Sequence, residues 1–224
     1  RDFKVVRKEA ESTEITSFYL EPADGGAVIA HLPGQYIGLT AVVDGVEQRR
    51  NYSLSAASNG KSYRISVKRE AGGKVSGHLH DQVQVGDVLQ LFAPSGHFTL
   101  QDSRKPLVLI SGGVGITPTL PMLQAALPTG REITFIHCAR DRGVHAFREK
   151  IDALAAANEQ LTRRYCYDQA QADDGVDLQG HLSTDALAQW LPESRDADVY
   201  FLGPRDFMRS VKQSLQALGV PEAD

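Results

Sequence analysis

The stretch from Pro106 to Pro118, PLVLISGGVGITP, constrains the fold of this chain more than any other part of the sequence. It opens with a short apolar run, which is typical of a strand buried in a parallel sheet. The glycines over 112–115 then predict a turn in which the backbone can take positive φ and let a ligand come close. Thr117 and Pro118 follow as a predicted cap and first-turn proline of a helix. The segment therefore predicts a strand, a glycine turn and a helix in direct succession.

Such a succession can bind an anion, because the free N–H groups and the dipole of the helix point at one spot. The pattern is not a full G-x-G-x-x-G, since Pro118 stands at the third glycine position. In addition, Pro121 predicts a helix that becomes regular only from that residue onward. The spacing alone leaves two interpretations open: a phosphate cradle, or a tight turn that needs glycine only for steric reasons.

Length and composition restrict the class of protein. At 224 residues the chain is long enough for two modest domains, and its hydrophobic content of 42% is ordinary for a globular protein. The net charge of -4, without a basic block, gives no reason to expect nucleic acid or an anionic membrane as partner. No apolar stretch reaches the ~20 residues that span a bilayer. Cys138 and Cys166 lie in apolar runs, which predicts reduced core thiols and a cytoplasmic protein.

Residues 1–104 contain short alternating strands separated by turn residues. This pattern predicts an antiparallel β-barrel of about six strands. Within it, Asp44-Gly45 predicts a hairpin turn. A short helix is expected over 75–83, with Ser76 as its cap after two glycines. This would be a second helix N-terminus that follows glycine, and therefore a second potential phosphate site.

The stretch Arg50-Asn51-Tyr52-Ser53 is chemically the most suggestive part of this half. Arg50 offers a planar guanidinium for phosphate oxygens. The Tyr52 ring offers a face on which a flat heterocycle can stack, and Ser53 offers a hydroxyl for a ring nitrogen. In a regular strand Arg50 and Tyr52 share one face. The alternative is structural: Tyr52 is an amphipathic barrel residue and Arg50 pairs with a surface carboxylate.

Residues 105–224 change to an alternation of strands and helices, which predicts an α/β domain with a parallel sheet. Ligands of such sheets bind beyond the carboxyl ends of the strands. The loops there are expected to meet at one edge and lie at 111–115, 139–142 and 203–206. Strands are expected over 106–111, 131–138, 161–167 and 198–202, and helices over 119–127, 146–158, 183–191 and 207–218.

Seven short motifs follow one another over essentially the whole chain: Pro33–Tyr36, Arg50–Ser53, Val67–Ser76, Val85–Val88, Ser111–Pro118, Val144–Ala146 and Gly203–Met208. In sequence and order they resemble the ferredoxin–NADP reductase superfamily, in particular the reductase module of bacterial flavohaemoglobins. The resemblance implies a barrel that binds FAD and a sheet domain that binds NAD(P)H. The chain starts at Arg1 without Met, where the family passes from globin to reductase, and this predicts a fragment of a longer protein.

The resemblance also implies roles for individual residues. Arg50 would bind the FAD pyrophosphate, Tyr52 would pack on the isoalloxazine, and Ser53 would lie near N5, the atom that accepts hydride. Tyr52 and Ser53 are therefore the predicted catalytic residues. The other implied cofactor-binding residues are Tyr36 and Asn51 in the barrel; Gly73, Lys74, Val75 and Ser76 at a second pyrophosphate-binding turn; Ser111, Gly112, Gly113, Val114, Gly115, Ile116, Thr117 and Pro118 in the NAD(P) loop; and Gly203 and Pro204 beside the nicotinamide.

Two features depart from the family's pattern. Leu202 stands where the family usually has a cysteine before Gly-Pro, and this predicts slower hydride transfer without loss of binding. The sequence ends at 221–224, before the family's last strand and the aromatic segment that covers the flavin. We therefore expect either a truncated chain or a tail that the sequence does not include.

The implied function is an oxidoreductase module in which NAD(P)H reduces FAD and the flavin passes single electrons to an acceptor. In a flavohaemoglobin that acceptor is haem in a globin domain upstream of the reductase, and the activity converts nitric oxide to nitrate. A stand-alone flavin reductase or oxygenase reductase component is the alternative within this class, and no plant-type iron–sulfur cysteine cluster is present. A redox-inactive nucleotide-binding or regulatory module is the alternative from another class, which Leu202 and the short C-terminus favour.

Arg140 and Arg142 follow the second predicted strand of the sheet, where dinucleotide enzymes distinguish a ribose hydroxyl from a 2′-phosphate. Arg140 is accordingly a predicted cofactor-binding residue, and NADPH is expected to be tolerated. A solvated basic turn is the alternative. No metal site is predicted, because His78 and His80 lack a third ligand nearby in the sequence. His137 is expected to be a hydrogen-bonded core histidine.

Overall fold

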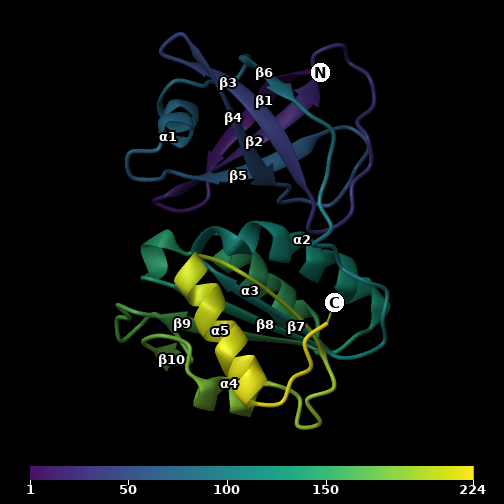
Figure 1. Cartoon of the computed structure of the whole chain (residues 1–224), viewed down its shortest axis with the longest axis vertical. Coiled ribbons are helices and arrows are strands. Elements are labelled where there is room, and N and C mark those ends of the chain that lie inside the picture. The colour runs from purple at the N-terminus through teal and green to yellow at the C-terminus, as the bar shows by residue number, and fades with distance from the viewer. Residues whose placement is uncertain (224) are drawn as a thin grey trace.

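The computed structural model describes residues 1–223 and contains two β-sheets, one in each half of the chain (Figure 1). The first half forms the upper part of the view and the second half the lower part. Within residues 1–223, every helix is too short or too polar to cross a membrane.

The first half is an antiparallel barrel of six strands in the order β4-β3-β6-β1-β2-β5. Leu54, directly after β4, forms an isolated bridge with Ile65 of β5, so the two ends of the strand order meet. The predicted six-stranded antiparallel barrel is confirmed. Its elements are β1 (Asp2–Ala10), β2 (Ile15–Pro22), β3 (Tyr36–Val43), β4 (Val46–Ser53), β5 (Tyr63–Lys68), α1 (Lys74–Asp81) and β6 (Val88–Leu91).

Alternation along the strands decides which side chains enter the barrel. In β1, Phe3 and Val5 are buried while the residues between and beside them are exposed. Burying an apolar side chain of this kind stabilises the folded state by roughly 1.5–3 kcal/mol relative to leaving it exposed. The β3–β4 hairpin turns at Asp44 and Gly45, whose φ values are 52° and 76°. Positive φ at both positions is what a two-residue hairpin turn requires, so the predicted Asp-Gly turn is confirmed.

The second half is a five-stranded sheet in the order β10-β9-β8-β7-β11, and all of its neighbouring pairs are parallel. The predicted parallel α/β fold is confirmed. Strand β10 was not predicted, because it has only two residues and lies just after a polar loop. The elements are β7 (Leu107–Gly112), α2 (Ile116–Ala126), β8 (Ile133–Ala139), α3 (Arg148–Ala157), β9 (Leu161–Tyr167), β10 (Leu178–Gln179), α4 (Thr184–Trp190), β11 (Asp198–Leu202) and α5 (Arg205–Ala217).

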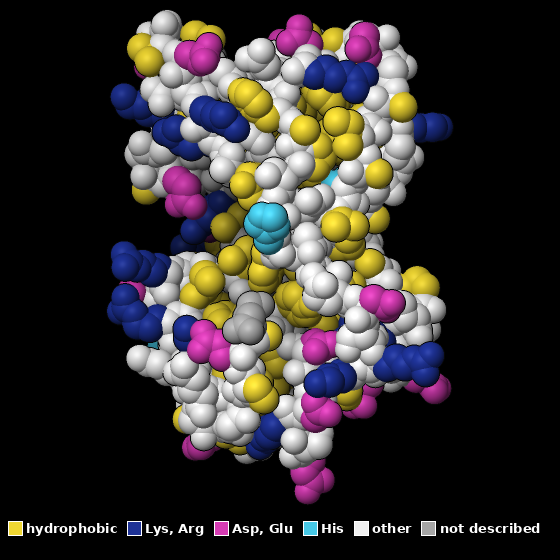
Figure 2. All heavy atoms as spheres, turned by 45° about the vertical axis from the view of Figure 1, so that its right-hand side comes forward, with side chains coloured by type: hydrophobic (Ala, Val, Ile, Leu, Met, Phe, Trp, Pro, Cys, Tyr) yellow, Lys and Arg dark blue, Asp and Glu magenta, His cyan; other side chains and the backbone are white. Residues whose placement is uncertain are grey.

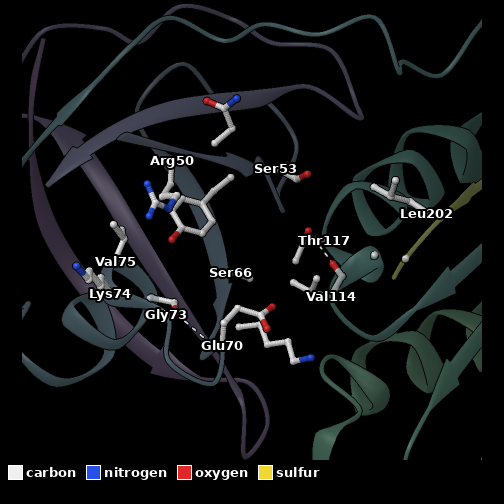
Figure 3. A pocket seen from close by; sticks show the side chains of 16 residues that line it. Arg50, Ser53, Ser66, Glu70, Gly73, Lys74, Val75, Val114, Thr117 and Leu202 are labelled. Atoms are coloured by element: carbon white, nitrogen blue, oxygen red, sulfur yellow. Dashed lines mark hydrogen bonds between the residues drawn. The ribbon is translucent and has the colours of Figure 1, made fainter. Parts of the chain in front are cut away.

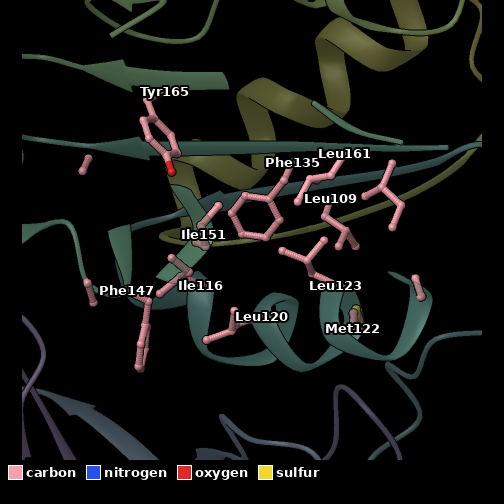
Figure 4. Close-up of a cluster of buried hydrophobic side chains, with 14 of the residues drawn as sticks. Leu109, Ile116, Leu120, Met122, Leu123, Phe135, Phe147, Ile151, Leu161 and Tyr165 are labelled. Carbon is pink, nitrogen blue, oxygen red and sulfur yellow. The ribbon is translucent and has the colours of Figure 1, made fainter. Parts of the chain in front are cut away.

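Helices cover both faces of the parallel sheet. On one face, α2 and α3 pack against β7, β8 and β9 around Phe135 (Figure 4). On the other face, α4 and α5 bury Leu187, Val211 and Leu215. Helix α2 lies between this sheet and the barrel (Figure 1). The segment after β7 is therefore the part of the second half that faces the first.

The predictions about where the helices start are partly wrong. Ser76 does not cap α1: its hydroxyl accepts a hydrogen bond from the N–H of Glu70 (3.0 Å), which the preceding turn brings close. Thr117 lies inside the first turn of α2, where its Oγ1 donates to the carbonyl of Val114 (3.0 Å). Helix α2 also begins before Pro121. Residues 116–123 are all buried, and the free energy gained by packing this helix is larger than the cost of the one backbone hydrogen bond that Pro121 removes.

The two halves meet at the hairpin between β1 and β2. Ile15, the first residue of β2, packs into the core of the α/β half rather than into the barrel. Beside it, the N–H of Thr13 donates to the carbonyl of Gly143 (2.9 Å). Farther along the contact, the N–H of Gln101 donates to the hydroxyl of Tyr200 (2.9 Å). Figure 2 shows apolar side chains gathered along the waist between the halves. A side chain of one half thus completes the core of the other.

We expect Ile15→Ala to lower the free energy of unfolding by about 2–5 kcal/mol, because it leaves a cavity in a packed core. Urea denaturation of the whole chain measures this change. Ile29→Ala is the matched control: Ile29 is 60% exposed, whereas Ile15 is 2% exposed. The control should change the free energy of unfolding by no more than about 0.5 kcal/mol. Equal effects of the two substitutions would contradict the role given to Ile15.

Candidate functional site

A cleft of about 340 Å³ lies where the barrel faces the glycine turn (Figure 3). In the close-up, Arg50, Lys74 and Val75 lie on the barrel side, while Val114 and Leu202 lie on the side of the α/β half. Both halves therefore contribute to one site. The lining residues are Arg50, Asn51, Tyr52, Ser53, Ser66, Lys68, Glu70, Gly73, Lys74, Val75, Ser76, Val114, Gly115, Thr117, Leu202 and Gly203.

The end of β4 forms the barrel wall of the cleft. The Arg50 guanidinium is exposed, and its one hydrogen bond within residues 1–223 goes to the carbonyl of Arg49 (2.8 Å). The predicted alternative, a pairing of Arg50 with a surface carboxylate, therefore does not occur within that range. Burial raises the pKa of Tyr52 to about 12, against a smaller opposite effect of the Arg50 cation. Tyr52 thus keeps its phenolic proton at neutral pH, and the wall combines a free cation with a neutral aromatic ring.

Helix α1 points its N-terminus at the same cleft. The N-cap residue, Gly73, supplies no side-chain cap, and no acidic residue lies in the first turn. The first N–H groups of the helix, on Lys74, Val75 and Ser76, are orphan donors of the kind that bind anions. These residues and Arg50 line the same cleft, so helix N–H groups and a guanidinium, both donors that favour phosphate oxygens, border one space.

The glycine turn forms the opposite wall and touches the loop after β11. A Cβ atom on Gly115 would lie 2.1 Å from the carbonyl oxygen of Leu202, so no side chain can be accommodated there. Gly113 has φ of 54°, a conformation that other residues rarely adopt. The steric interpretation of these glycines is therefore correct. It does not exclude the phosphate interpretation, because the same turn also lines the cleft.

Strand order explains why these loops meet. The chain leads from β7 outward through β8 and β9 to β10, and then returns to place β11 on the other side of β7. The loops after β7 and β11 thus flank the point where the strand order reverses, which is where open α/β sheets bind their ligands. Val114 and Gly203 come from these loops and line the cleft.

A buried polar chain lies behind the turn. The hydroxyl of Ser111 shares a hydrogen bond with Nδ1 of His137 (2.7 Å), and the His137 ring lies 4.3 Å from that of His145, centroid to centroid. Nδ1 of His145 contacts the Tyr167 hydroxyl (2.5 Å), which accepts a hydrogen bond from Arg148 (2.9 Å). The predicted core position of His137 is correct. The prediction that this histidine is fully hydrogen-bonded is wrong, because its buried Nε2 has no hydrogen-bond partner among residues 1–223.

Burial keeps both of these imidazoles neutral. It lowers the pKa of His137 to about 3, and burial followed by the nearby His137 lowers the pKa of His145. A proton on either ring would place a charge in a site without a counter-ion among the contacts described. The residues Ser111, His137, His145 and Tyr167 therefore form an uncharged support beneath the turn, and Arg148 adds a permanent cation at its far end.

The structure separates the predicted cofactor-binding residues into two groups. The cleft brings together Arg50, Asn51, Tyr52, Ser53, Gly73, Lys74, Val75, Ser76, Val114, Gly115, Thr117 and Gly203. The other predicted residues do not line the cleft. Five of them belong to the strand, turn and helix around the lining residues: Ser111, Gly112, Gly113, Ile116 and Pro118. Tyr36 pairs with Ser53 in the barrel sheet, Arg140 follows β8, and Pro204 precedes α5.

Sequence reasoning gave no role to three further lining residues, Ser66, Lys68 and Glu70. Ser66 and Lys68 alternate along β5 and so share a face, and Glu70 follows the strand. The alternation of Ser66 and Lys68 on one face, just before the glycine turn at 72–73, was the signal in the sequence that could have indicated these lining residues. It was not decisive, because nothing in the sequence says that β5 and β4 border one cleft.

Comparison with known proteins identifies the family. The Oxidoreductase FAD-binding domain matches residues 2–100 and the Oxidoreductase NAD-binding domain matches residues 109–213. The solved flavohem-like FAD/NAD-binding domain of nitric oxide dioxygenase from Vibrio cholerae superimposes with a TM-score of 0.92 at 41% identity, covering 99% of this chain and 94% of that one. The chain belongs to the flavohaemoglobin reductase family. The resemblance predicted from the motifs is confirmed.

Members of the flavohaemoglobin reductase family occur within longer proteins. The chain is 64% identical to the flavohemoprotein of Pseudomonas putida over 222 residues, which cover 99% of this chain and 57% of that protein. It also superimposes on the flavohemoglobin of Malassezia yamatoensis, solved with bound FAD and heme, with a TM-score of 0.86 at 26% identity over 99% of this chain and 57% of that one. The chain thus spans little more than half the length of these relatives.

The buried histidines give a prediction for acid stability. The pKa of His137 is about 3 in the folded protein and ordinarily 6.5, so the unfolded chain takes up the proton first. Above pH 6.5 the imidazole is neutral in both states, so it does not lower the free energy of unfolding. As the pH falls from 6.5 toward 3, only the unfolded chain binds the proton, and the free energy of unfolding decreases. We expect His137→Asn to make the loss of unfolding free energy between about pH 6 and pH 4 shallower, by up to about 1.4 kcal/mol per pH unit.

Urea denaturation at a series of pH values measures that slope. His97→Asn, which changes an exposed imidazole, is the control and should leave the slope as it is. A slope that His137→Asn does not alter would mean that burial of this imidazole is not coupled to folding.

Proposed function

We propose that this chain oxidises NADH or NADPH and delivers the electrons to a separate acceptor. In this proposal residues 1–104 hold FAD and residues 105–224 hold the nicotinamide nucleotide. The observation that carries it is the shared cleft, in which Arg50 to Ser53 of the barrel face Val114 and Gly115 of the glycine turn. A flavin and a nicotinamide must touch in order to react, and a site between the two halves allows each half to present one of them.

The residues of the cleft fit FAD. The Arg50 guanidinium has no carboxylate partner within residues 1–223, and α1 presents uncapped N–H groups behind Gly73; both favour a pyrophosphate. Bound FAD would supply the redox chemistry, because it accepts a hydride and can release electrons singly. The protein itself therefore has to bind, orient and shield the cofactors.

Four further side chains have roles in this scheme. Tyr52 offers the face of a neutral ring for stacking against a flat heterocycle. Ser53, the next residue, offers a hydroxyl that donates to a ring nitrogen. Val114 and Leu202 line the opposite side of the cleft, where their apolar side chains would help to keep water from between the bound cofactors. The Leu202 side chain has no hydrogen-bonding group, so its contribution to the cleft is confined to packing.

We further propose that the acceptor is the haem of a globin domain upstream in the parent protein, and that the whole protein detoxifies nitric oxide in the cytoplasm. This rests on the relatives: the Malassezia structure contains heme as well as FAD, and the chain matches only 57% of it. The Vibrio domain is described as part of a nitric oxide dioxygenase. This chain would supply the electrons for that reaction and would not carry it out alone.

An anaerobic visible titration of the FAD-loaded chain, with NADH and then NADPH, tests the central step. We expect at least one nucleotide to bleach the flavin band, because both cofactors can reach the shared cleft. Bound flavin that neither nucleotide bleaches would contradict the proposed oxidoreductase and favour a redox-inactive module.

We expect Arg50→Gln to weaken FAD binding roughly 10- to 100-fold, since a hydrogen bond to a charged group is worth about 1.5–3 kcal/mol. Quenching of flavin fluorescence measures the dissociation constant. Arg49→Gln is the matched control, because the Arg49 guanidinium lies 3.8 Å from the centre of the Phe92 ring and outside the cleft. A similar loss in both variants would argue against direct contact between Arg50 and the pyrophosphate.

A further inference from the structure

Three buried serines and an arginine form a polar chain in the barrel, behind the cleft. Ser17 of β2 and Ser66 of β5 are paired in the sheet, and their hydroxyl oxygens lie 2.7 Å apart. The Ser66 hydroxyl also lies 2.8 Å from that of Ser55, which is 2.9 Å from Nε of Arg64. All four side chains are buried, yet Ser66 lines the cleft (Figure 3). The chain therefore connects Arg64 with the ligand space through two hydroxyls.

The guanidinium of Arg64 is a buried cation without a carboxylate partner. The Arg64 residue is only 8% exposed, and both hydrogen bonds of its side chain within residues 1–223 go to Ser55, one to Oγ and one to the carbonyl oxygen. Aromatic rings surround it instead. The guanidinium carbon lies 4.9 Å from the centre of the Phe147 ring, which belongs to the α/β half, and 5.8 Å from that of Tyr19. Its positive charge is therefore not neutralised by an ion pair within the described residues.

The other charged groups around the chain do not cancel this charge. Burial, followed by the Arg64 cation, lowers the pKa of Lys150, on which Glu11 has a smaller opposite effect. The charged side chains in and beside the cleft are Arg50, Lys68, Lys74 and Glu70, which line it, and Glu14 with its partner Arg140, next to Lys68. Cations thus outnumber carboxylates around the chain, and an electron-rich ligand in the cleft meets a positive environment.

The direction of the hydrogen bonds follows from the protons that each group can give. Arginine has only donors, so Ser55 accepts from Arg64 and has its own proton to donate. The near acceptor for that proton is Ser66, at 2.8 Å; the carbonyl of Arg64 is farther, at 3.3 Å, and already accepts the N–H of Ser55. The Ser17 hydroxyl has Ser66 as its one partner within residues 1–223 and therefore donates to it as well.

Ser66 is thereby left as a donor. A hydroxyl has two lone pairs and one proton, and both lone pairs of Ser66 are occupied by Ser17 and Ser55. Its own proton is then available to an acceptor atom in the cleft. Hydrogen bonds in a chain polarise one another, and the first bond of this chain comes from a cation. The cleft thus contains a hydroxyl donor that a buried positive charge strengthens.

We propose that Arg64 is a positioning residue that acts through Ser55 to make Ser66 a hydrogen-bond donor toward the flavin ring, and that this donor stabilises reduced FAD more than oxidised FAD. The inference rests on the proposed function. A neutral ring that accepts a hydride gains one negative charge until it also binds a proton. A hydrogen bond to a charged group is stronger than one to a neutral group, and such bonds are a means by which a protein tunes a flavin.

The two-electron midpoint potential of FAD bound to the whole chain tests this without a nicotinamide nucleotide. The potential reports the affinity for reduced FAD relative to that for oxidised FAD, so an equal loss of both affinities does not shift it. We expect Ser66→Ala to lower the relative affinity roughly tenfold, which makes the potential about 30 mV more negative. Ser58→Ala, which changes an exposed serine outside the cleft, is the control and should leave the potential as it is.

Variants of Ser55 and Arg64 separate the cause. Ser55→Ala interrupts the chain but leaves the cation in place, and should make the potential more negative. Arg64→Met removes the cation and should act in the same direction. In a chain that already carries Ser66→Ala, we expect Arg64→Met to change the relative affinity less than about 2-fold, because its effect passes through the missing hydroxyl. A potential that does not respond to Ser66→Ala or Ser55→Ala, or an Arg64→Met effect that persists without the Ser66 hydroxyl, would each overturn the proposal.

The same preparations separate this inference from the proposed function. Wild-type protein whose flavin is bleached by NADH or NADPH, but whose potential does not respond to the serine substitutions, would overturn only the role of the polar chain. Wild-type protein that binds no FAD would overturn both.

Discussion

The contact between the glycine turn and the loop after β11 is the constraint on which the site depends. A side chain at Gly115 would lie 2.1 Å from the carbonyl of Leu202, so only glycine lets these two loops touch. Their contact closes the sheet side of the cleft and brings Val114 and Gly203 within reach of one ligand. The glycines serve steric needs first, and the ligand site follows from the close approach that they permit.

The second constraint is the hairpin that joins the halves. Ile15 is a barrel residue by connectivity and a core residue of the α/β half by packing. The buried Ile15 side chain holds the neighbouring Thr13 and Glu14 in place. The hydrogen bond of Thr13 to Gly143 and the ion pair of Glu14 with Arg140 therefore have a more fixed geometry than exposed polar contacts usually have. The hairpin acts together with Phe98 and Leu100 of the first half, which also pack against the core of the α/β half, in holding the two halves against each other.

Local patterns predicted the elements well because each pattern has a local cause. The limits of β9 and β11 were predicted to the residue, since uninterrupted strand-forming runs end there at turn residues. Helix starts were predicted less well. Ser76 and Thr117 have the side chains of caps, but each hydroxyl bonds to a group that only the folded turn brings close. A capping residue can be recognised in sequence, whereas its partner cannot.

The sequence by itself determined the two fold classes, the family, and the stretches from which the cleft is built, because alternation, glycine spacing and motif order are written along the chain. Only the tertiary structure decided that β11 lies beside β7, that Lys68 and Glu70 share a cleft with Arg50, and that Glu14 meets Arg140. The reason is physical: strand order and the docking of one half on the other depend on the packing of residues far apart in the sequence, and no local pattern encodes which surfaces will meet.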